Sequence, residues 1–248
     1  MTETVLVIGA TGHIGVSAVI GALRTKRNVL AVVRNAAAVD KLFRLAGTRD
    51  GITTVEADIT SEHGLQSVVD KVKNGELPAF QHVYSAVGGV KTTTPLKDLS
   101  IEDFRANMSI NFDTNFFAYR ATIGYLLSQS NPTTYTVITG AIGDVGIWPG
   151  PAMSQGALYS LGISAELENR DTNVRFNEMY LAFPVMVDEE AVKEEAAKMG
   201  VVKASDFARS YENLLAKDEI KGSRIFIFTP GDIDTLRWES KAFKGPPS

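Results

Sequence analysis

Seven short apolar runs recur along the chain, and stretches long enough for helices separate them. Apolar residues fill consecutive positions of these runs, which is typical of strands that are buried on both faces of a sheet. Their alternation with helices predicts a doubly wound, Rossmann-type α/β fold, with a seven-stranded parallel sheet and helices on both faces. The predicted strands are residues 5–8, 29–33, 52–55, 82–87, 135–138, 174–182 and 224–228.

The 248 residues contain no internal repeat, no linker and no domain-sized change of composition. We therefore expect a single domain that spans residues 1–248. Residues 188–200, DEEAVKEEAAKMG, interrupt the approach to the last strand and read as one charged amphipathic helix. Such a helix is either a solvated surface element or a lid over the binding cleft, because inserted segments near clefts often move.

A glycine-rich motif follows the first strand directly and opens the first helix, which is the context that a dinucleotide-binding fingerprint requires. Gly9 permits the tight turn, Gly12 lets the backbone approach a pyrophosphate, and Gly15 allows close packing of helix on sheet. The helix N-terminus then presents free N–H groups to the phosphates. The predicted loop comprises Gly9, Thr11, Gly12, His13, Ile14 and Gly15.

The second strand distinguishes NADP from NAD. An acidic residue at its end would bind the ribose 2′-OH, whereas this strand ends in Arg34, which is placed to pair with a 2′-phosphate. The alternative is a solvated surface charge. NADP(H) is therefore the predicted cofactor. Further cofactor contacts are expected at Asp58, Ile59, Ala86, Gly88, Asn111 and Val185.

These features together resemble the short-chain dehydrogenase/reductase superfamily over nearly the whole chain. That family ends its fifth strand with a serine and begins the next helix with a Tyr-x-x-x-Lys motif. Here the three positions fall on Gly140, Pro151 and Gln155. Of the four usual catalytic residues only the helix-borne Asn111 is present, so the resemblance implies an intact cofactor site without the ordinary acid–base groups.

Reduction of a ketone needs a proton on oxygen, which the missing tyrosine would supply. An iminium carbon needs only the hydride, and a carboxylate nearby would stabilise its charge. Asp144 follows the fifth strand at the edge that faces the ligand crevice, although it is equally suited to forming a turn. Trp148 is expected either as a wall of the site or as core or dimer packing.

This combination is similar to an atypical branch of fungal short-chain reductases in prenylated indole alkaloid biosynthesis. The segments GATGHIGVSAVIGALR, VLAVVRN, GITTVEADIT and FFAYRATI carry the resemblance. It implies NADPH-dependent reduction of an iminium and an intramolecular [4+2] Diels–Alder closure, with an apolar, polycyclic small-molecule substrate. It also adds Arg120 to the catalytic candidates Asp144, Asn111 and Trp148, although an exposed salt bridge is the alternative role for that arginine.

Two other functions remain open. A ketoreductase could use a non-standard proton donor, namely Thr139, Asp144 or a substrate-bound water. A protein that binds NADP(H) as a sensor or scaffold would catalyse nothing.

Composition limits the partners. The net charge of -4 gives no basic excess for nucleic acid or a membrane surface, and the absence of cysteine excludes disulfides and thiolate ligands. No metal site is expected. No secretory signal or apolar span is evident, so a cytoplasmic location is expected. The helices predicted at residues 101–129 and 153–169 are apolar on more than one face, which predicts a homodimer or homotetramer.

Overall fold

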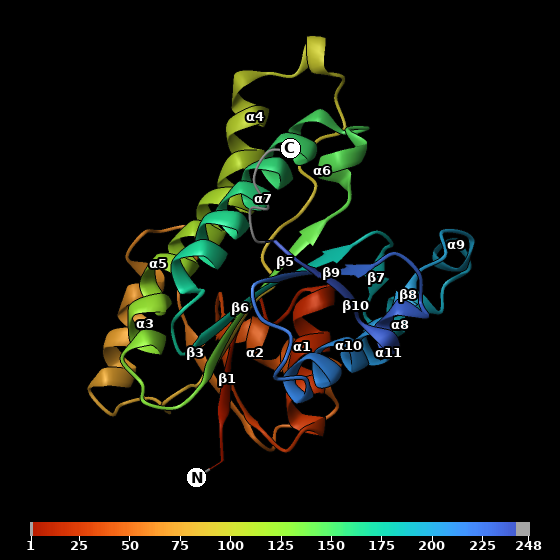
Figure 1. Ribbon diagram of the computed structural model, residues 1–248. Coiled ribbons are helices and arrows are strands. Elements are labelled where there is room, and N and C mark those ends of the chain that lie inside the picture. Colours follow the sequence, from red (N-terminus) through yellow and green to blue (C-terminus); the bar gives the residue numbers. More distant parts are fainter. Residues whose placement is uncertain (1, 242–248) are drawn as a thin grey trace.

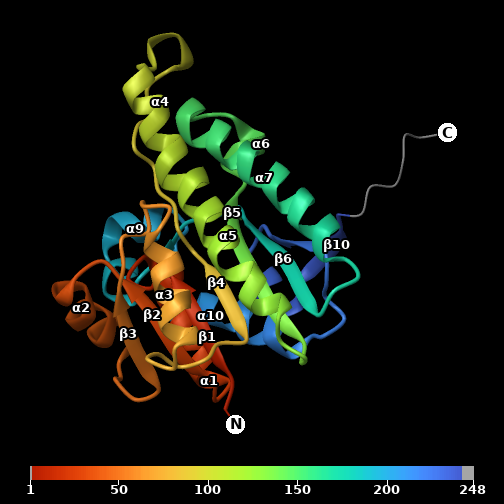
Figure 2. The ribbon, with the colours of Figure 1, turned by 90° about the vertical axis from the view of Figure 1, so that its left-hand side faces the viewer.

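An eight-stranded sheet lies between two layers of helices in the computed structural model, which describes residues 2–241 (Figures 1 and 2). The strand order is β10-β9-β6-β5-β4-β1-β2-β3, and all neighbours are parallel except β10 and β9. The strands are β1 (Thr4–Ile8), β2 (Asn28–Val33), β3 (Ile52–Glu56), β4 (His82–Ser85), β5 (Thr133–Gly140), β6 (Val174–Leu181), β9 (Ser223–Ile227) and β10 (Arg237–Ser240). The order reverses between β1 and β4, where ligands of doubly wound sheets bind.

The two helical layers bury alternate residues of the strands, which explains why each strand is apolar throughout. On β1, Val5 and Val7 join the core beneath α1 and α10, whereas Leu6 and Ile8 join the core beneath α3 and α5. All four side chains are fully buried. The helices are α1 (His13–Arg24), α2 (Ala36–Ala46), α3 (Gly64–Lys73), α4 (Ile101–Met108), α5 (Thr114–Leu127), α6 (Ile142–Val145), α7 (Pro149–Asn169), α8 (Asp188–Ala191), α9 (Glu194–Lys198), α10 (Ala204–Ala216) and α11 (Asp232–Thr235), with a short 3-10 helix at Leu96–Asp98.

All seven predicted strands are present, and the doubly wound architecture is confirmed, but the predicted strand number is wrong. The additional strand, β10, pairs antiparallel with β9 at the edge of the sheet, with Trp238 opposite Ile225. All four β10 side chains are exposed, so this strand has no apolar run to reveal it. A separate two-stranded sheet joins β7 (Val185–Met186) to β8 (Val202–Lys203).

Two expected helices are interrupted. The helix predicted at residues 101–129 consists of α4, a π-helical turn at Ser109–Asp113, and α5. The segment at residues 188–200 is two short helices, α8 and α9, rather than one. An ion pair between Arg44 and Glu189 ties α8 to α2. No helix within residues 2–241 is both long and apolar enough to cross a membrane.

Candidate cofactor and substrate site

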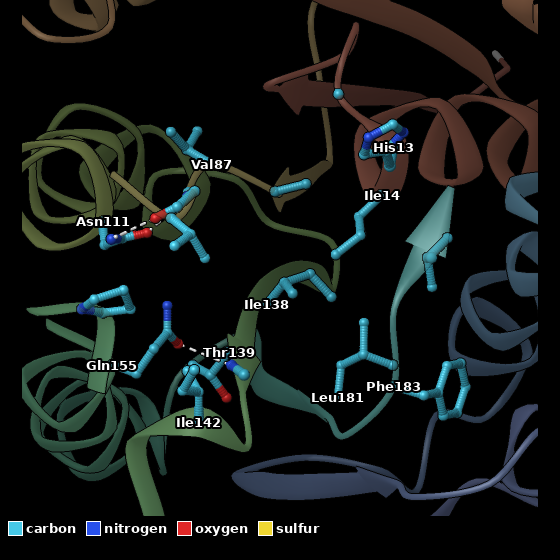
Figure 3. Close-up of a pocket in the computed structure, with 18 residues that line it drawn as sticks. His13, Ile14, Val87, Asn111, Ile138, Thr139, Ile142, Gln155, Leu181 and Phe183 are labelled. Carbon is cyan, nitrogen blue, oxygen red and sulfur yellow. Dashed lines mark hydrogen bonds between the residues drawn. The ribbon is translucent and has the colours of Figure 1, made fainter. Parts of the chain in front are cut away.

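Two adjoining cavities lie along the carboxyl ends of the central strands. The first, about 470 Å³, is lined by the glycine loop and by residues that follow β2 and β3. The second, about 370 Å³, is lined by residues from α1, β5, α7 and the loop after β6 (Figure 3). The two cavities share Gly12, Ala86, Val87 and Gly88. A dinucleotide could therefore lie along both, with one half in each cavity.

The glycine loop has the geometry that close approach of a phosphate requires. Gly9 has φ +83°, and a Cβ there would lie 2.7 Å from the carbonyl oxygen of Ala86. A Cβ on Gly15 would lie 2.0 Å from the carbonyl oxygen of Gly9, so only glycine fits. Gly12 caps α1 without a side-chain hydrogen bond, which leaves the first N–H groups of the helix available to an anion.

Two charged residues, Arg34 and Asp58, line the first cavity beyond β2 and β3. Arg34 is exposed and lines this cavity together with Asp58 and Ile59. The carboxylate of Asp58 accepts hydrogen bonds from the hydroxyl and the backbone N–H of Thr60, at 2.6 and 2.9 Å. These bonds hold the pKa of Asp58 below its ordinary value. A fixed carboxylate and an exposed guanidinium thus flank the space expected for the adenosine half.

His13 lines the second cavity, but its ring nitrogens face the chain after β6. Nδ1 lies 3.2 Å from the backbone N–H of Val187, and Nε2 lies 3.8 Å from the carboxylate of Glu190. This contact joins the glycine loop to the beginning of the segment at residues 188–200. Val185, also predicted as a cofactor contact, lines the same cavity.

A ladder of asparagines joins the loop after β4 to the helical segment made of α4, the π-helical turn and α5. The amide of Asn111 accepts from the N–H of Gly89 (2.8 Å) and donates to the carbonyl oxygens of Gly89 and Asn107. Asn115, one turn later, donates to the carbonyl oxygen of Val87 and to that of Asn111. Side chains that insert into the helical ladder account for the π-helical turn. Both polar ends of the Asn111 amide are therefore occupied by protein groups.

Helix α7 holds the last residue of β5 from both sides. The N–H of Gly140 donates to Oε1 of Gln155 at 2.8 Å, and the hydroxyl of Tyr159 donates to the carbonyl oxygen of Gly140 at 2.5 Å. Burial, with the neighbouring carboxylate of Asp144, raises the pKa of Tyr159 above its ordinary value. Tyr159 is therefore a neutral hydroxyl that is already committed to the backbone.

The hydroxyl of Thr139 points away from the cavity into a buried charge cluster. It donates at 2.6 Å to the carboxylate of Glu178, which has no exposed surface. Arg224 donates to the same carboxylate at 3.1 Å, and Lys241 contacts it as well. The guanidinium of Arg224 also lies 4.5 Å from the ring centre of Tyr159. Thr139 thus contributes to a structural network behind the cavity.

The structure does not bring the other catalytic candidates to the cavities. Asp144, on α6, is not among the lining residues, and its carboxylate accepts a hydrogen bond of 2.8 Å from Tyr180. Trp148 is 38 % exposed at the N-cap of α7 and also lies outside both linings. Arg120 lines a separate hollow on the α3 and α5 side, with His63 and Phe117.

The sequence model of the family described as short chain dehydrogenase matches residues 3–200. The chain belongs to the short-chain dehydrogenase family. An NADP-dependent (R)-specific alcohol dehydrogenase from Lentilactobacillus kefiri is 26 % identical over 200 residues, which cover 77 % of this chain and 78 % of the relative.

Solved structures show the same fold. The structure of ElxO with NADP bound has a TM-score of 0.78 at 14 % identity, covering 89 % of this chain and 94 % of that one. A short-chain dehydrogenase from Shigella flexneri 2a, in complex with NADP, has a TM-score of 0.75 at 18 % identity, covering 88 % and 92 %. The cofactor named for all three proteins is the one that Arg34 predicts for this chain.

Proposed function

We propose that this protein is an NADP(H)-dependent oxidoreductase that transfers hydride to substrates which need no proton from the protein, with cyclic imines in their iminium form as the preferred class. The glycine loop, the uncapped N-terminus of α1 and the guanidinium of Arg34 fit a dinucleotide that carries a 2′-phosphate. The bound cofactor would supply the hydride. The residues around it hold and orient both molecules.

One observation carries the choice of substrate class. Within residues 2–241, the hydroxyl and imidazole side chains that line the second cavity, those of Thr139 and His13, are directed at protein groups rather than at the open space. Thr139 is committed to Glu178, and both ring nitrogens of His13 face residues 187–190. Gln155 carries an amide, which does not act as an acid. A neutral ketone would have to take its proton from water, whereas an iminium needs none.

The residues of the cavity would then act by shape and exclusion of water. Five large apolar side chains line the cavity that Figure 3 shows, namely those of Ile14, Ile138, Ile142, Leu181 and Phe183. An apolar wall of this kind holds a flat, apolar substrate against the nicotinamide and keeps competing water from the reacting carbon. Asp144 is oriented by Tyr180 and stays a candidate only for longer-range stabilisation of a cation.

The test compares a permanently cationic imine with a ketone. NADPH oxidation is followed with N-methyl-3,4-dihydroisoquinolinium and with acetophenone, against the rate without protein. We expect turnover of the iminium at a rate that does not vary with pH between neutral and mildly alkaline values, and ketone reduction at least about a hundredfold slower. Ketone reduction as fast as that of the iminium would instead establish a ketoreductase. Tight NADPH binding with no turnover of either compound would establish a sensor or scaffold.

The same apolar wall favours a second activity, the [4+2] cyclisation that the fungal resemblance implies. A cycloaddition needs no acid or base, only reacting groups held in contact. The measurement is the product ratio and the enantiomeric excess when a prochiral azadiene with a tethered alkene is incubated with the NADP⁺ complex. A racemic mixture formed at the rate seen without protein would refute this activity.

A further inference from the structure

Strand β10 ends the sheet on the opposite side of the molecule from β3, and no other strand of the described chain pairs with its outer edge (Figure 2). On its inner side β10 runs antiparallel to β9, with Arg237 opposite Phe226 and Glu239 opposite Arg224. Residues of a strand direct their backbone groups alternately to the two neighbouring strands. Because the carbonyl oxygen of Ile227 accepts a hydrogen bond from the residue after β6, Phe226 and Arg224 bond to β10 on the other side. Arg237 and Glu239 are therefore the inward-facing residues of β10.

The backbone of Trp238 faces the opposite way. This residue lies between Arg237 and Glu239, so its N–H and C=O groups point out of the sheet, where no group of the described chain meets them. A strand edge with outward N–H and C=O groups is a template for pairing with a strand of another chain. The edge is also flanked by exposed apolar side chains, those of Trp238 itself, Ile163 and Phe228.

The charged side chains of β10 have opposite signs and lie two positions apart, on the same face of the sheet. Within the described residues neither of them forms an ion pair. The guanidinium of Arg237 lies over the rings of Phe226 and Phe228, at 5.3 and 5.0 Å. The carboxylate of Glu239 borders a surface hollow of about 260 Å³ that Ile163 also lines. A positive and a negative group thus stand beside the open edge.

We propose that β10 pairs antiparallel with β10 of a second copy of this chain, around a twofold axis at Trp238, so that the two sheets become one. In this register the N–H of each Trp238 donates to the C=O of the other, and Arg237 of each copy lies opposite Glu239 of the other. A surface that pairs with itself around a twofold axis must be self-complementary. Opposite charges directly across two strands stabilise the pair, whereas like charges destabilise it. Self-complementary charge is what favours a second copy over an unrelated strand.

The position of the axis follows from the same alternation. Ser240 is the other outward-facing position of β10, but an axis there would place Glu239 opposite Lys241. The ammonium of Lys241 already contacts the buried carboxylate of Glu178. An axis at Trp238 uses only side chains that are exposed. This surface centres on β10 and is separate from the cavities, so it stands independently of the proposed function.

Charge reversal tests both the partner and the register. Arg237→Glu places glutamate opposite glutamate, and Glu239→Arg places arginine opposite arginine. Sedimentation of the full chain over about 1–100 µM measures dimerisation, since a short edge makes a small interface. Each single variant should raise the dimer Kd about tenfold or more, and the double variant should restore it to within about threefold of the parent protein. Lys73→Glu, the same change of charge at an exposed position of α3, is the control and should leave the Kd unchanged.

Mixing the two single variants sharpens this test. An equimolar mixture of Arg237→Glu and Glu239→Arg sets glutamates of one copy against arginines of the other at both positions. Dimers should therefore form in the mixture at concentrations where each variant alone is monomeric. Circular dichroism and the unfolding midpoint establish that each variant is folded.

A cross-link at the axis gives a second readout. The chain contains no cysteine, so any disulfide must form at an introduced one. Residues that face each other in a hydrogen-bonded antiparallel pair have Cα atoms about 5.5 Å apart, which a disulfide can span. Under mild oxidation Trp238→Cys should form a disulfide-linked dimer at least about tenfold faster than Trp148→Cys. The two tryptophans are matched in exposure, at 40 % and 38 %.

Three results would overturn the proposal. A parent protein that stays monomeric up to about 100 µM would show that the edge does not bind a second copy and would leave it to a strand of another protein. Single charge reversals that dimerise as the parent protein does would place the interface elsewhere on the chain. Folded single variants that stay monomeric when mixed, together with equally slow cross-linking at positions 238 and 148, would exclude the twofold axis at Trp238.

Discussion

Substitution of Glu178 by Gln tests whether the charge cluster behind the cavity stabilises the fold. The carboxylate of Glu178 has no exposed surface. It accepts hydrogen bonds from Thr139 and Arg224, and it forms an ion pair with Lys241. A glutamine keeps the shape but brings an NH₂ group close to the donors of Thr139 and Arg224 and to the Lys241 ammonium, and it leaves the two cations with less compensation. Breaking a buried ion pair by removing one partner typically destabilises by about 3–5 kcal/mol.

The loss is measured by urea unfolding followed by circular dichroism. With an m-value of about 3 kcal/mol per molar urea, the midpoint should fall by about 1 M or more. Glu239→Gln, an exposed carboxylate on β10, serves as the control and should shift the free energy of unfolding by less than about 0.5 kcal/mol. The double variant Glu178→Gln with Lys241→Met should recover part of the loss, because the orphaned cation is removed as well.

A Glu178→Gln protein that unfolds within about 1 kcal/mol of the parent would refute this reasoning. It would mean that water or a rearranged side chain compensates the two cations. An equal loss in the single and double variants would mean that the ammonium group does not depend on this carboxylate.

Three further predictions follow from single positions. Burial lowers the pKa of His82 below its usual 6.5, so below that pH the unfolded chain binds a proton before the folded chain does. Stability should therefore fall as pH drops through 6.5, and urea titrations of His82→Gln should show a weaker pH slope than those of the parent protein. Arg34→Ala should weaken NADPH binding about tenfold to a hundredfold and leave NADH unchanged by fluorescence titration; equal losses for both would contradict the 2′-phosphate assignment. Gly15→Ala should abolish NADPH binding, because its Cβ would meet the carbonyl oxygen of Gly9, whereas Gly156→Ala, with open space around it, should bind normally.

The architecture could be predicted because each strand is buried on both faces. The alternate burial of Val5 and Leu6 in opposite cores leaves a continuous apolar run that identifies β1 without any contact information. β10 gives no such signal, because all its side chains are exposed. It forms a strand because it pairs with β9 at the edge of the sheet, and this pairing leaves no pattern in its own sequence. Short helices such as α8 are likewise set by contacts with distant residues, here Arg44 and Ser205, which no local pattern contains.

The cofactor loop could be predicted for a different reason. Backbone geometry fixes residue type there, since Gly9 and Gly15 admit no side chain. The chemistry of the second cavity could not be read in this way. An aspartate a few residues after β5 is suited both to stabilising a bound cation and to forming a turn. The hydrogen bond from Tyr180 shows where the Asp144 carboxylate points, and this contact cannot be predicted from the local sequence. The asparagine ladder does leave a sequence signal, because residues 107, 111 and 115 recur every four positions on one helical face.

Gly140, Pro151 and Gln155, which we align with the family's serine, tyrosine and lysine positions, are structurally compatible with one another at the start of α7. Pro151 lies in the first turn of this helix, where N–H groups have no intrahelical partner, so proline loses nothing there. Gln155, one turn later, accepts a hydrogen bond from the N–H of Gly140, the last residue of β5. With proline, glutamine and glycine at these places, this part of the wall presents the amide of Gln155, which does not act as an acid. Because each of these residues fits the local backbone, we expect a well-formed wall at this place, which is what the proposed hydride transfer without a protein acid requires.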